Sequence, residues 1–200
     1  MGARAATSTP HHGPHRAGAD EGPPPLRVHH IDVDVYHRIV EAGALEDRRV
    51  ELLEGLIVDM SPQSIPHSLV LERLTEHFRG ARARLRVQLP FEIPPDSEPE
   101  PDLALVEEEP SREHQPRTAL LIAEVAVSSH PIDRNVKARL YAGAGIPAYW
   151  LIDVPGHAVE VRGEPGSDGY GNCRVYREGE TVPSPAAGAG DLDVSALLGD

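Results

Sequence analysis

The segment 118–127, TALLIAEVAV, is a nearly unbroken apolar run that contains one acid, Glu124. A run of this kind is typical of a strand that is buried on both faces of a sheet. An ionised carboxylate in such a strand is costly unless it is paired with a cation or bound to a metal ion. Glu124 is therefore the first candidate for a functional residue. The alternative is a glutamate at the exposed end of the strand, paired with an arginine.

Around this strand, the chain alternates between helical and extended patterns. The segment RVELLEGLIVDM predicts a hairpin that turns near Glu54-Gly55. The helices are expected at 33–42, 66–79 and 133–144. The other strands are expected at 83–89, 102–106, 148–154, 157–163 and 172–177. Because strands and helices are interspersed, the sequence predicts one α/β unit with two or three layers.

The length of 200 residues suits one domain with polar tails. Residues 1–25 are rich in Pro, Gly, His and Ala without periodicity, which predicts a disordered tail. The folded domain is expected over residues 26–182. Residues 183–200 are expected to form a C-terminal tail, whose apolar stretch LDVSALL can dock on the domain.

Composition narrows the compartment and the kinds of partner. No apolar run reaches the roughly 18 residues that a membrane span needs, and the N-terminus has no hydrophobic segment typical of a secretory signal. The single cysteine, Cys173, excludes an internal disulfide and a cysteine-based zinc cluster. We therefore expect a cytoplasmic protein with no membrane partner. The net charge of −13 disfavours non-specific nucleic-acid binding, but it does not exclude a nuclease, because a metal site itself needs clustered carboxylates.

Asp102 is a second acid in a position that suits a metal ligand. It follows a proline and stands at the head of a short apolar strand, in the segment EPEPDLALV. It lies 22 positions before Glu124, which is enough for two adjacent strands and their connection. If these strands pair, the two carboxylates can reach one oxygen-preferring cation such as Mg²⁺. The alternative is a solvated or capping aspartate.

The helix that follows the buried strand supplies a cation. Asp133, Lys137 and Tyr141 are spaced by four residues and form one stripe of this helix. Val136 and Leu140 form another stripe, which is expected to face the core. Lys137 is also the only lysine in a chain with 18 arginines, and a compact ammonium can hold a water molecule or a phosphoryl oxygen as a point charge. We expect Lys137 to point towards the carboxylates; the alternative is coincidence.

Two acids flank the predicted hairpin turn, and either can complete the acidic set. Glu51 continues a strand and can project towards the site. Glu54 directly precedes Gly55 and therefore suits a turn. We favour Glu51.

In these residues the chain resembles a bacterial family described as "putative restriction endonuclease", within the PD-(D/E)XK nuclease superfamily. The matching pieces span roughly residues 30–165 and stand in the order VELLEGLIVDMSP, SIPHSLV, DSEPEPDLALV and AEVAVSSHPIDRNVKARLYAGAGIPAYWLIDV. Each motif alone is weak, whereas the combination is specific. The resemblance implies a restriction-endonuclease-like α/β fold, with a mixed central sheet flanked by helices.

The resemblance also implies a role for each of the acids and for the lysine. Asp102 corresponds to the Asp of the PD element, Glu124 to its (D/E), and Glu51 to the upstream acid. The usual lysine two positions after Glu124 is absent, because Ala126 stands there, and Lys137 takes its place from the following helix. Lys137 would orient the attacking water or neutralise the developing charge.

The acids that the resemblance assigns would hold one or two Mg²⁺ or Mn²⁺ ions, together with the carbonyl of Val125. His67 matches the family's recurrent histidine; it either contacts a phosphate or supports the site, or else it caps the helix that follows. Asp133 and Tyr141 are expected to surround the ligands. Val127 stands where relatives often have a polar or acidic residue, which bears on full activity.

The resemblance thus predicts a metal-dependent endonuclease that hydrolyses phosphodiester bonds of DNA. Because two strands need two sites, we expect a homodimer. One alternative is a catalytically weak module that binds nucleic acid or protein, which the acidic charge and Val127 favour. Another is a metal-dependent phosphoesterase that acts on small nucleotides, for which a negative surface is less of a handicap.

Overall fold

The computed structural model describes Gly2 and residues 27–109, 111–128 and 131–199. Apart from Gly2, the predicted disordered tail at 1–25 lies outside the described residues. None of the helices in these ranges is long and apolar enough to cross a membrane.

A six-stranded sheet with the order β3-β4-β5-β6-β7-β8 forms the centre of the molecule. Strands β5 and β6 are parallel, and every other pair of neighbours is antiparallel. The predicted mixed sheet is therefore confirmed. Its strands are β3 (Arg84–Val87), β4 (Leu103–Val106), β5 (Leu121–Ala126), β6 (Ala148–Asp153), β7 (Ala158–Gly166) and β8 (Gly169–Arg177). All six residues of β5 are buried, as the apolar run predicts.

Helices cover both faces of this sheet, so the unit has three layers. One face packs against α2 (Ile65–Phe78) and the short C-terminal helix α4 (Val194–Leu198). The other face packs against a continuous helical segment, which consists of the π-helix η1 (Ile132–Lys137) and the α-helix α3 (Ala138–Gly143). Residues of β5 alternate between the two cores because successive side chains of a strand point to opposite faces.

A hairpin and a helix lie beside the main sheet, and the hairpin carries Glu51. Strands β1 (Val50–Leu53) and β2 (Leu56–Asp59) are antiparallel, and the predicted turn at Glu54-Gly55 is confirmed. Only glycine fits at position 55 of this turn, because the φ of Gly55 is +78° and a Cβ there would lie 2.5 Å from the Cβ of His30. The backbone of Leu52 exchanges two hydrogen bonds with Glu98, which anchors β1 near the start of β4.

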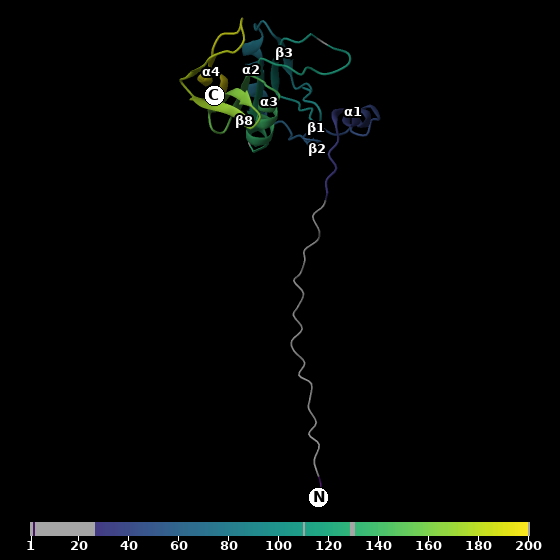
Figure 1. The fold of residues 1–200 in the computed structure, drawn as a ribbon. Helices are drawn as coiled ribbons and strands as arrows, with labels where there is room; N and C mark the ends of the chain where they lie inside the picture. The colour runs from purple at the N-terminus through teal and green to yellow at the C-terminus, as the bar shows by residue number, and fades with distance from the viewer. Residues whose placement is uncertain (1, 3–26, 110, 129–130, 200) are drawn as a thin grey trace.

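The helix α1 (Val33–Glu41) covers the hairpin, as Figure 1 shows for α1, β1 and β2. Its N-terminus is capped, since the Asp32 side chain accepts a hydrogen bond from the N–H of Val35 at 2.8 Å. Val33 and Tyr36 of this helix pack against Leu52 of β1.

The C-terminal segment packs into the core of the same unit. Strands β9 (Thr181–Val182) and β10 (Leu192–Asp193) pair with each other, and α4 follows directly. Figure 1 places the C-terminus and α4 beside β8, on the opposite side from α1. The expected docking of the stretch LDVSALL therefore occurs. Its buried members contact the layer formed by α2 and the sheet, and they are Leu192, Val194, Leu197 and Leu198.

Truncating one buried residue of α4 tests how much this docking stabilises the domain. Leu197 is 2% exposed, and we expect Leu197→Ala to lower the free energy of unfolding by about 2–5 kcal/mol, because it leaves a cavity in the core. The matched control is Leu89→Ala, at a leucine that is 45% exposed, which should change it by less than about 0.5 kcal/mol. Urea unfolding measures both; equal effects would contradict the docking.

Candidate active site

The pairing of β4 with β5 brings Asp102 and Glu124 together. The register places Leu103 opposite Ala123, so the residues just beyond them in the ladder are neighbours. The N–H of Val125 donates to Oδ2 of Asp102 at 2.8 Å, and the N–H of Asp102 lies 3.4 Å from Oε2 of Glu124. The two carboxylates are therefore adjacent at one end of the sheet, as the sequence spacing predicts.

Lys137 points from η1 into this acidic cluster. Its Nζ lies 3.2 Å from Oε1 of Glu124, 3.0 Å from Oε2 of Glu51 and 3.9 Å from Oδ1 of Asp133. The hydroxyl of Tyr141 donates to the same Oε1 of Glu124 at 2.9 Å. Side-chain exposure is only 4% for Glu124 and 6% for Lys137, so these charges interact with little screening by water.

The predicted stripe of Asp133, Lys137 and Tyr141 thus faces inward, and all three residues are buried. The prediction that Val136 and Leu140 face the core is wrong, because both are partly exposed. The sheet below the helix presents Glu124, which attracts the polar stripe. The apolar packing of α3 then comes from Ala138, Tyr141 and Ala142.

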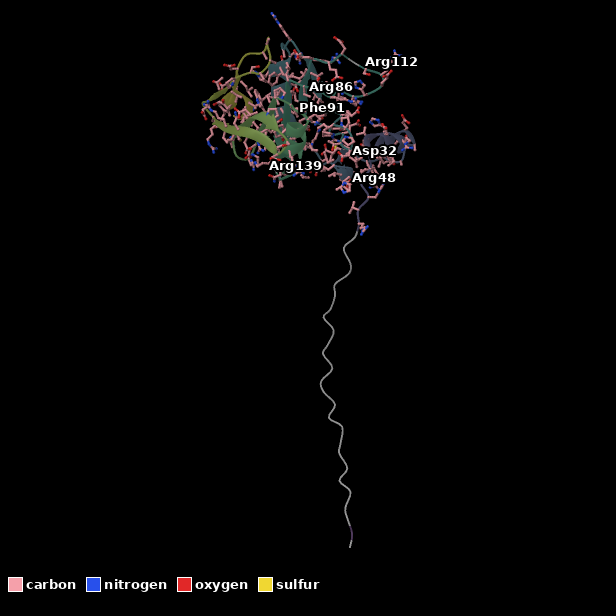
Figure 2. The ribbon with its side chains drawn as sticks, viewed as in Figure 1. Asp32, Arg48, Arg86, Phe91, Arg112 and Arg139 are labelled. Atoms are coloured by element: carbon pink, nitrogen blue, oxygen red, sulfur yellow. The ribbon has the colours of Figure 1, made fainter. Side chains whose placement is uncertain are left out.

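The structure places Glu51, and not Glu54, beside the lysine. Glu51 lies on buried β1, and its Oε2 also accepts the N–H of Glu100 at 3.1 Å. Glu54 sits in the hairpin turn, where its side chain pairs with Arg139 at 2.6 Å. Arg139 is on the outer side of α3, near the edge of the molecule in Figure 2.

Asp102 is held by donors from two further elements. Oδ1 accepts hydrogen bonds from Nε2 of Gln88 at 3.1 Å and from Nε2 of His67 at 3.0 Å. Burial alone would raise the pKa of Asp102, but the hydrogen bond and charge of His67, with the N–H of Val125, hold this pKa below its usual value. The structure therefore supports the expectation that His67 lies at the site, and its backbone N–H also contacts the N-capping Ser64.

Burial and neighbouring charges act in opposite directions on the pKa values of Glu124 and Lys137. Burial raises the pKa of Glu124 well above its usual value; Lys137 counteracts this shift, and Asp102 adds to it. Burial also opposes the charge of Lys137, but Glu124, Glu51 and Asp133 together raise its pKa above the ordinary value. Lys137 therefore remains an ammonium, while the surrounding carboxylates repel one another.

A cavity of about 120 Å³ lies against these residues. Among its described lining residues, carboxylates outnumber permanently charged cations by six to two. The acids are Glu51, Asp59, Glu100, Asp102, Glu124 and Asp133, and the cations are Arg49 and Lys137. This excess of negative charge favours a bound cation.

The oxygen atoms suit a hard divalent cation such as Mg²⁺. Oε1 of Glu124 is engaged by Lys137 and Tyr141, while Oε2 has, among the residues that the structure describes, only the long contact with the N–H of Asp102. Oδ2 of Asp102 accepts one backbone N–H. Because a carboxylate oxygen has two acceptor positions, Oε2 of Glu124 and Oδ2 of Asp102 can each also bind a metal ion. Within the described ranges, however, no three acidic, histidine or cysteine side chains already form a complete metal-ligand group.

Val125 and Val127 also line the cavity. The backbone N–H of Val125 serves Asp102, and a ligand role for its carbonyl stays a prediction. Val127 presents an apolar side chain to the cavity, and its effect on activity stays a prediction.

Comparisons with known proteins identify the family of the chain and one structural relative. The family model described as "Uma2: Putative restriction endonuclease" matches residues 33–195. The chain belongs to the Uma2 family. One solved structure that resembles this Uma2 chain is described as "a putative nuclease belonging to DUF820" from Anabaena variabilis ATCC 29413. The two are 20% identical, with a TM-score of 0.62, and the match covers 74% of this chain and 89% of the other, which shows a shared fold. No curated protein matches the chain.

Gln88, whose side chain contacts Asp102, was not among the residues expected at the site. This residue follows β3, the antiparallel neighbour of β4, and its backbone adopts φ +50°. Its N–H also donates to the carbonyl of Asp102 at 3.1 Å. The only signal was its position near the end of the strand expected at 83–89, although the observed β3 ends at Val87 and leaves Gln88 just beyond it. Arg49 and Glu100 also line the cavity and were not expected there. Arg49 directly precedes β1, which belongs to a separate hairpin, and Glu100 reaches the site through its contact with Glu51 of that strand.

Removing the lysine should destabilise the metal-free protein. We expect Lys137→Met to lower the free energy of unfolding by about 3–5 kcal/mol at pH 7, because it leaves buried carboxylates without their cation. The matched control is Arg139→Met in the same helical segment. Its pair with Glu54 is about half exposed and should contribute less than about 1 kcal/mol. Thermal and urea unfolding in a chelator measure both; an unchanged Lys137→Met protein would show that the network is not stabilising.

Proposed function

We propose that this Uma2 protein is a metal-dependent endonuclease that hydrolyses phosphodiester bonds of DNA. The observation that carries the proposal is the convergence of Asp102, Glu124 and Lys137 at one acidic cavity. Two carboxylates and an ammonium at this position supply a cation site and a fixed positive charge, which hydrolysis of a phosphodiester needs. Membership of the family and the shared nuclease fold support the same function.

Asp102, Glu124 and Glu51 are the residues that would hold Mg²⁺ or Mn²⁺. A bound divalent ion lowers the pKa of a water molecule and stabilises negative charge on phosphoryl oxygens. The protein holds its own ligands in place: His67 and Gln88 fix one oxygen of Asp102, and Tyr141 fixes one oxygen of Glu124. These contacts limit the rotation of both carboxylates before the metal arrives.

Lys137 contacts Oε1 of Glu124, whereas Oε2 is the oxygen that would bind the metal ion. Its ammonium donates hydrogen bonds and accepts none, so it can hold the attacking water or a phosphoryl oxygen, but it does not remove a proton. The strongly raised pKa keeps this charge in place at neutral pH. The role of a proton acceptor falls to a carboxylate or to bulk water.

DNA is the proposed substrate, and a homodimer is the proposed assembly, because cutting both strands of a duplex requires two sites. The net charge of −13 limits the affinity for a polyanion. The same charge and the small acidic cavity favour a second candidate, a phosphoesterase that acts on small nucleotides. The two candidates use the same residues and differ in the substrate that is cleaved.

Plasmid cleavage tests the proposed function. We expect supercoiled plasmid to be nicked or linearised with Mg²⁺ or Mn²⁺, and EDTA to abolish this activity because the site then lacks its cation. Glu124→Gln, Asp102→Asn and Lys137→Met should each reduce the rate by at least about 100-fold. Arg139→Met, purified in parallel, should cut like the wild-type protein.

The same variants distinguish the proposed DNA nuclease from a contaminating enzyme, from a phosphoesterase that acts on small nucleotides, and from a binding module. Equal cutting by wild type and Glu124→Gln would identify a contaminating nuclease. Intact plasmid with rapid hydrolysis of a small phosphodiester, lost in the same variants, would replace the DNA substrate with small nucleotides. Intact plasmid and intact small diester across several metals would refute catalysis and leave a binding module.

A further inference from the structure

The residues Asp133 and Lys137 lie on a π-helix rather than an α-helix. In η1 the N–H of Ala138 donates to the carbonyl of Asp133, five residues earlier. π-Helical turns are rare and occur frequently at functional sites. Such a wide turn is less favourable than an α-turn, so contacts from outside the helix are needed to select it.

Two side chains from the central sheet supply such contacts. The hydroxyl of Tyr149 donates to the carbonyl of Asp133 at 2.9 Å. Nη1 of Arg162 donates to the next carbonyl, that of Arg134, also at 2.9 Å. Two successive carbonyls of η1 are therefore hydrogen-bonded to side chains of β6 and β7.

These two donors are direct neighbours in the sheet. Tyr149 and Arg162 are Cα partners in the β6–β7 ladder, and on the other side Tyr149 is the partner of Ile122 in β5. Glu124 follows two residues later in β5, on the same face as Ile122. One rigid sheet thus carries both Glu124 and the two donors that contact η1. The register of the strands therefore fixes the position of Glu124 relative to this helix.

Arg162 is itself fixed by a carboxylate. Its Nη2 donates to Oε2 of Glu160 at 3.0 Å, and Glu160 also pairs with the side chain of Arg134 in η1. Tyr149 is fully buried, and its ring packs against Tyr141 with centroids 5.3 Å apart. Neither donor can therefore move far from η1 without disturbing the core.

We propose that Tyr149 and Arg162 are positioning residues for Lys137. By holding the carbonyls of Asp133 and Arg134, they fix the π-helical turn in the orientation that places the Lys137 ammonium between Glu51 and Glu124. The geometric part of this inference is independent of the reaction. Its catalytic consequence rests on the proposed nuclease function.

Tyr170 offers a matched control for a merely structural role. Its ring stacks on that of Tyr149 with centroids 6.0 Å apart, and its hydroxyl donates to the carbonyl of Ile146 at 3.0 Å. Tyr170→Phe removes the same chemical group from the same aromatic cluster, but it removes a contact to the segment after α3 instead of η1. The two Tyr→Phe variants should thus differ at Lys137 although their chemistry is identical.

The single lysine makes its ammonium directly observable. Protein labelled with ¹⁵N at the lysine side chain gives one Nζ resonance, because Lys137 is the only lysine. We expect Tyr149→Phe to shift this resonance and to speed the exchange of its protons with water, whereas Tyr170→Phe leaves both as in the wild type. An unchanged Nζ signal in Tyr149→Phe, or equal changes in both variants, would overturn the proposal.

Arg162→Gln is a second variant, which keeps one side-chain donor but removes the guanidinium. It should change the Nζ signal in the same direction as Tyr149→Phe. If Tyr149→Phe does not fold, Arg162→Gln decides the matter by the same criterion. Far-ultraviolet circular dichroism and an unfolding curve establish that each variant is folded.

Kinetics test the catalytic consequence. Tyr149→Phe should lower kcat for plasmid cleavage on the order of 10- to 100-fold, because a displacement of about 1 Å at a catalytic group has effects of that size. The change in kcat should exceed any change in KM or in the affinity for Mn²⁺, since the substitution removes none of the carboxylates. A displaced Nζ signal in a protein that cuts no substrate would support the positioning role and count against the nuclease function. A normal signal with reduced kcat would overturn the positioning role alone.

Discussion

The contacts of one buried ammonium, that of Lys137, connect a hairpin, the central sheet and a helix that come from separate parts of the chain. Its Nζ lies within 4 Å of carboxylates from β1, β5 and η1. A buried charge is tolerated only when partners of opposite charge surround it. The hairpin, the central strand and the π-helix therefore have to meet at one place, and the bridge between Leu52 and Glu98 secures the hairpin there. The same interaction links folding to the proposed chemistry.

The ammonium does not balance all of the charge around it. Glu51, Glu124 and Asp133 contact one cation, and Asp102 lies next to Glu124 with its own histidine partner. Burial raises the pKa of Glu124, and the neighbouring carboxylates add to this rise. A divalent cation would relieve this repulsion, because it would add two positive charges beside the carboxylates. The acidic net charge of the chain is thus partly a property of its site, although it limits the binding of a polyanion.

Sequence reasoning identified the acids because an acid inside an apolar strand has few explanations. Glu124 and Asp102 followed from the strand pattern, and their adjacency followed from the spacing between them. The π-helical turn was not predictable, because it depends on donors from β6 and β7 that approach only in the folded sheet. The misassigned stripe of Val136 and Leu140 has the same origin: helical periodicity identifies two stripes, but the polar group beneath decides which one faces inward. Gln88 escaped notice because its role depends on a left-handed backbone at the end of an edge strand.

The position of the lysine has a structural consequence. A lysine two residues after Glu124 would belong to the same strand, and strand geometry alone would fix its relation to the acid. Ala126 is buried at that position, and the lysine comes from the neighbouring helical layer. The distance between acid and ammonium then depends on how the helix is held against the sheet, which leaves more freedom than a strand does. Hydrogen bonds from the sheet to the carbonyls of η1 remove that freedom, and they do so next to the residue whose placement matters most.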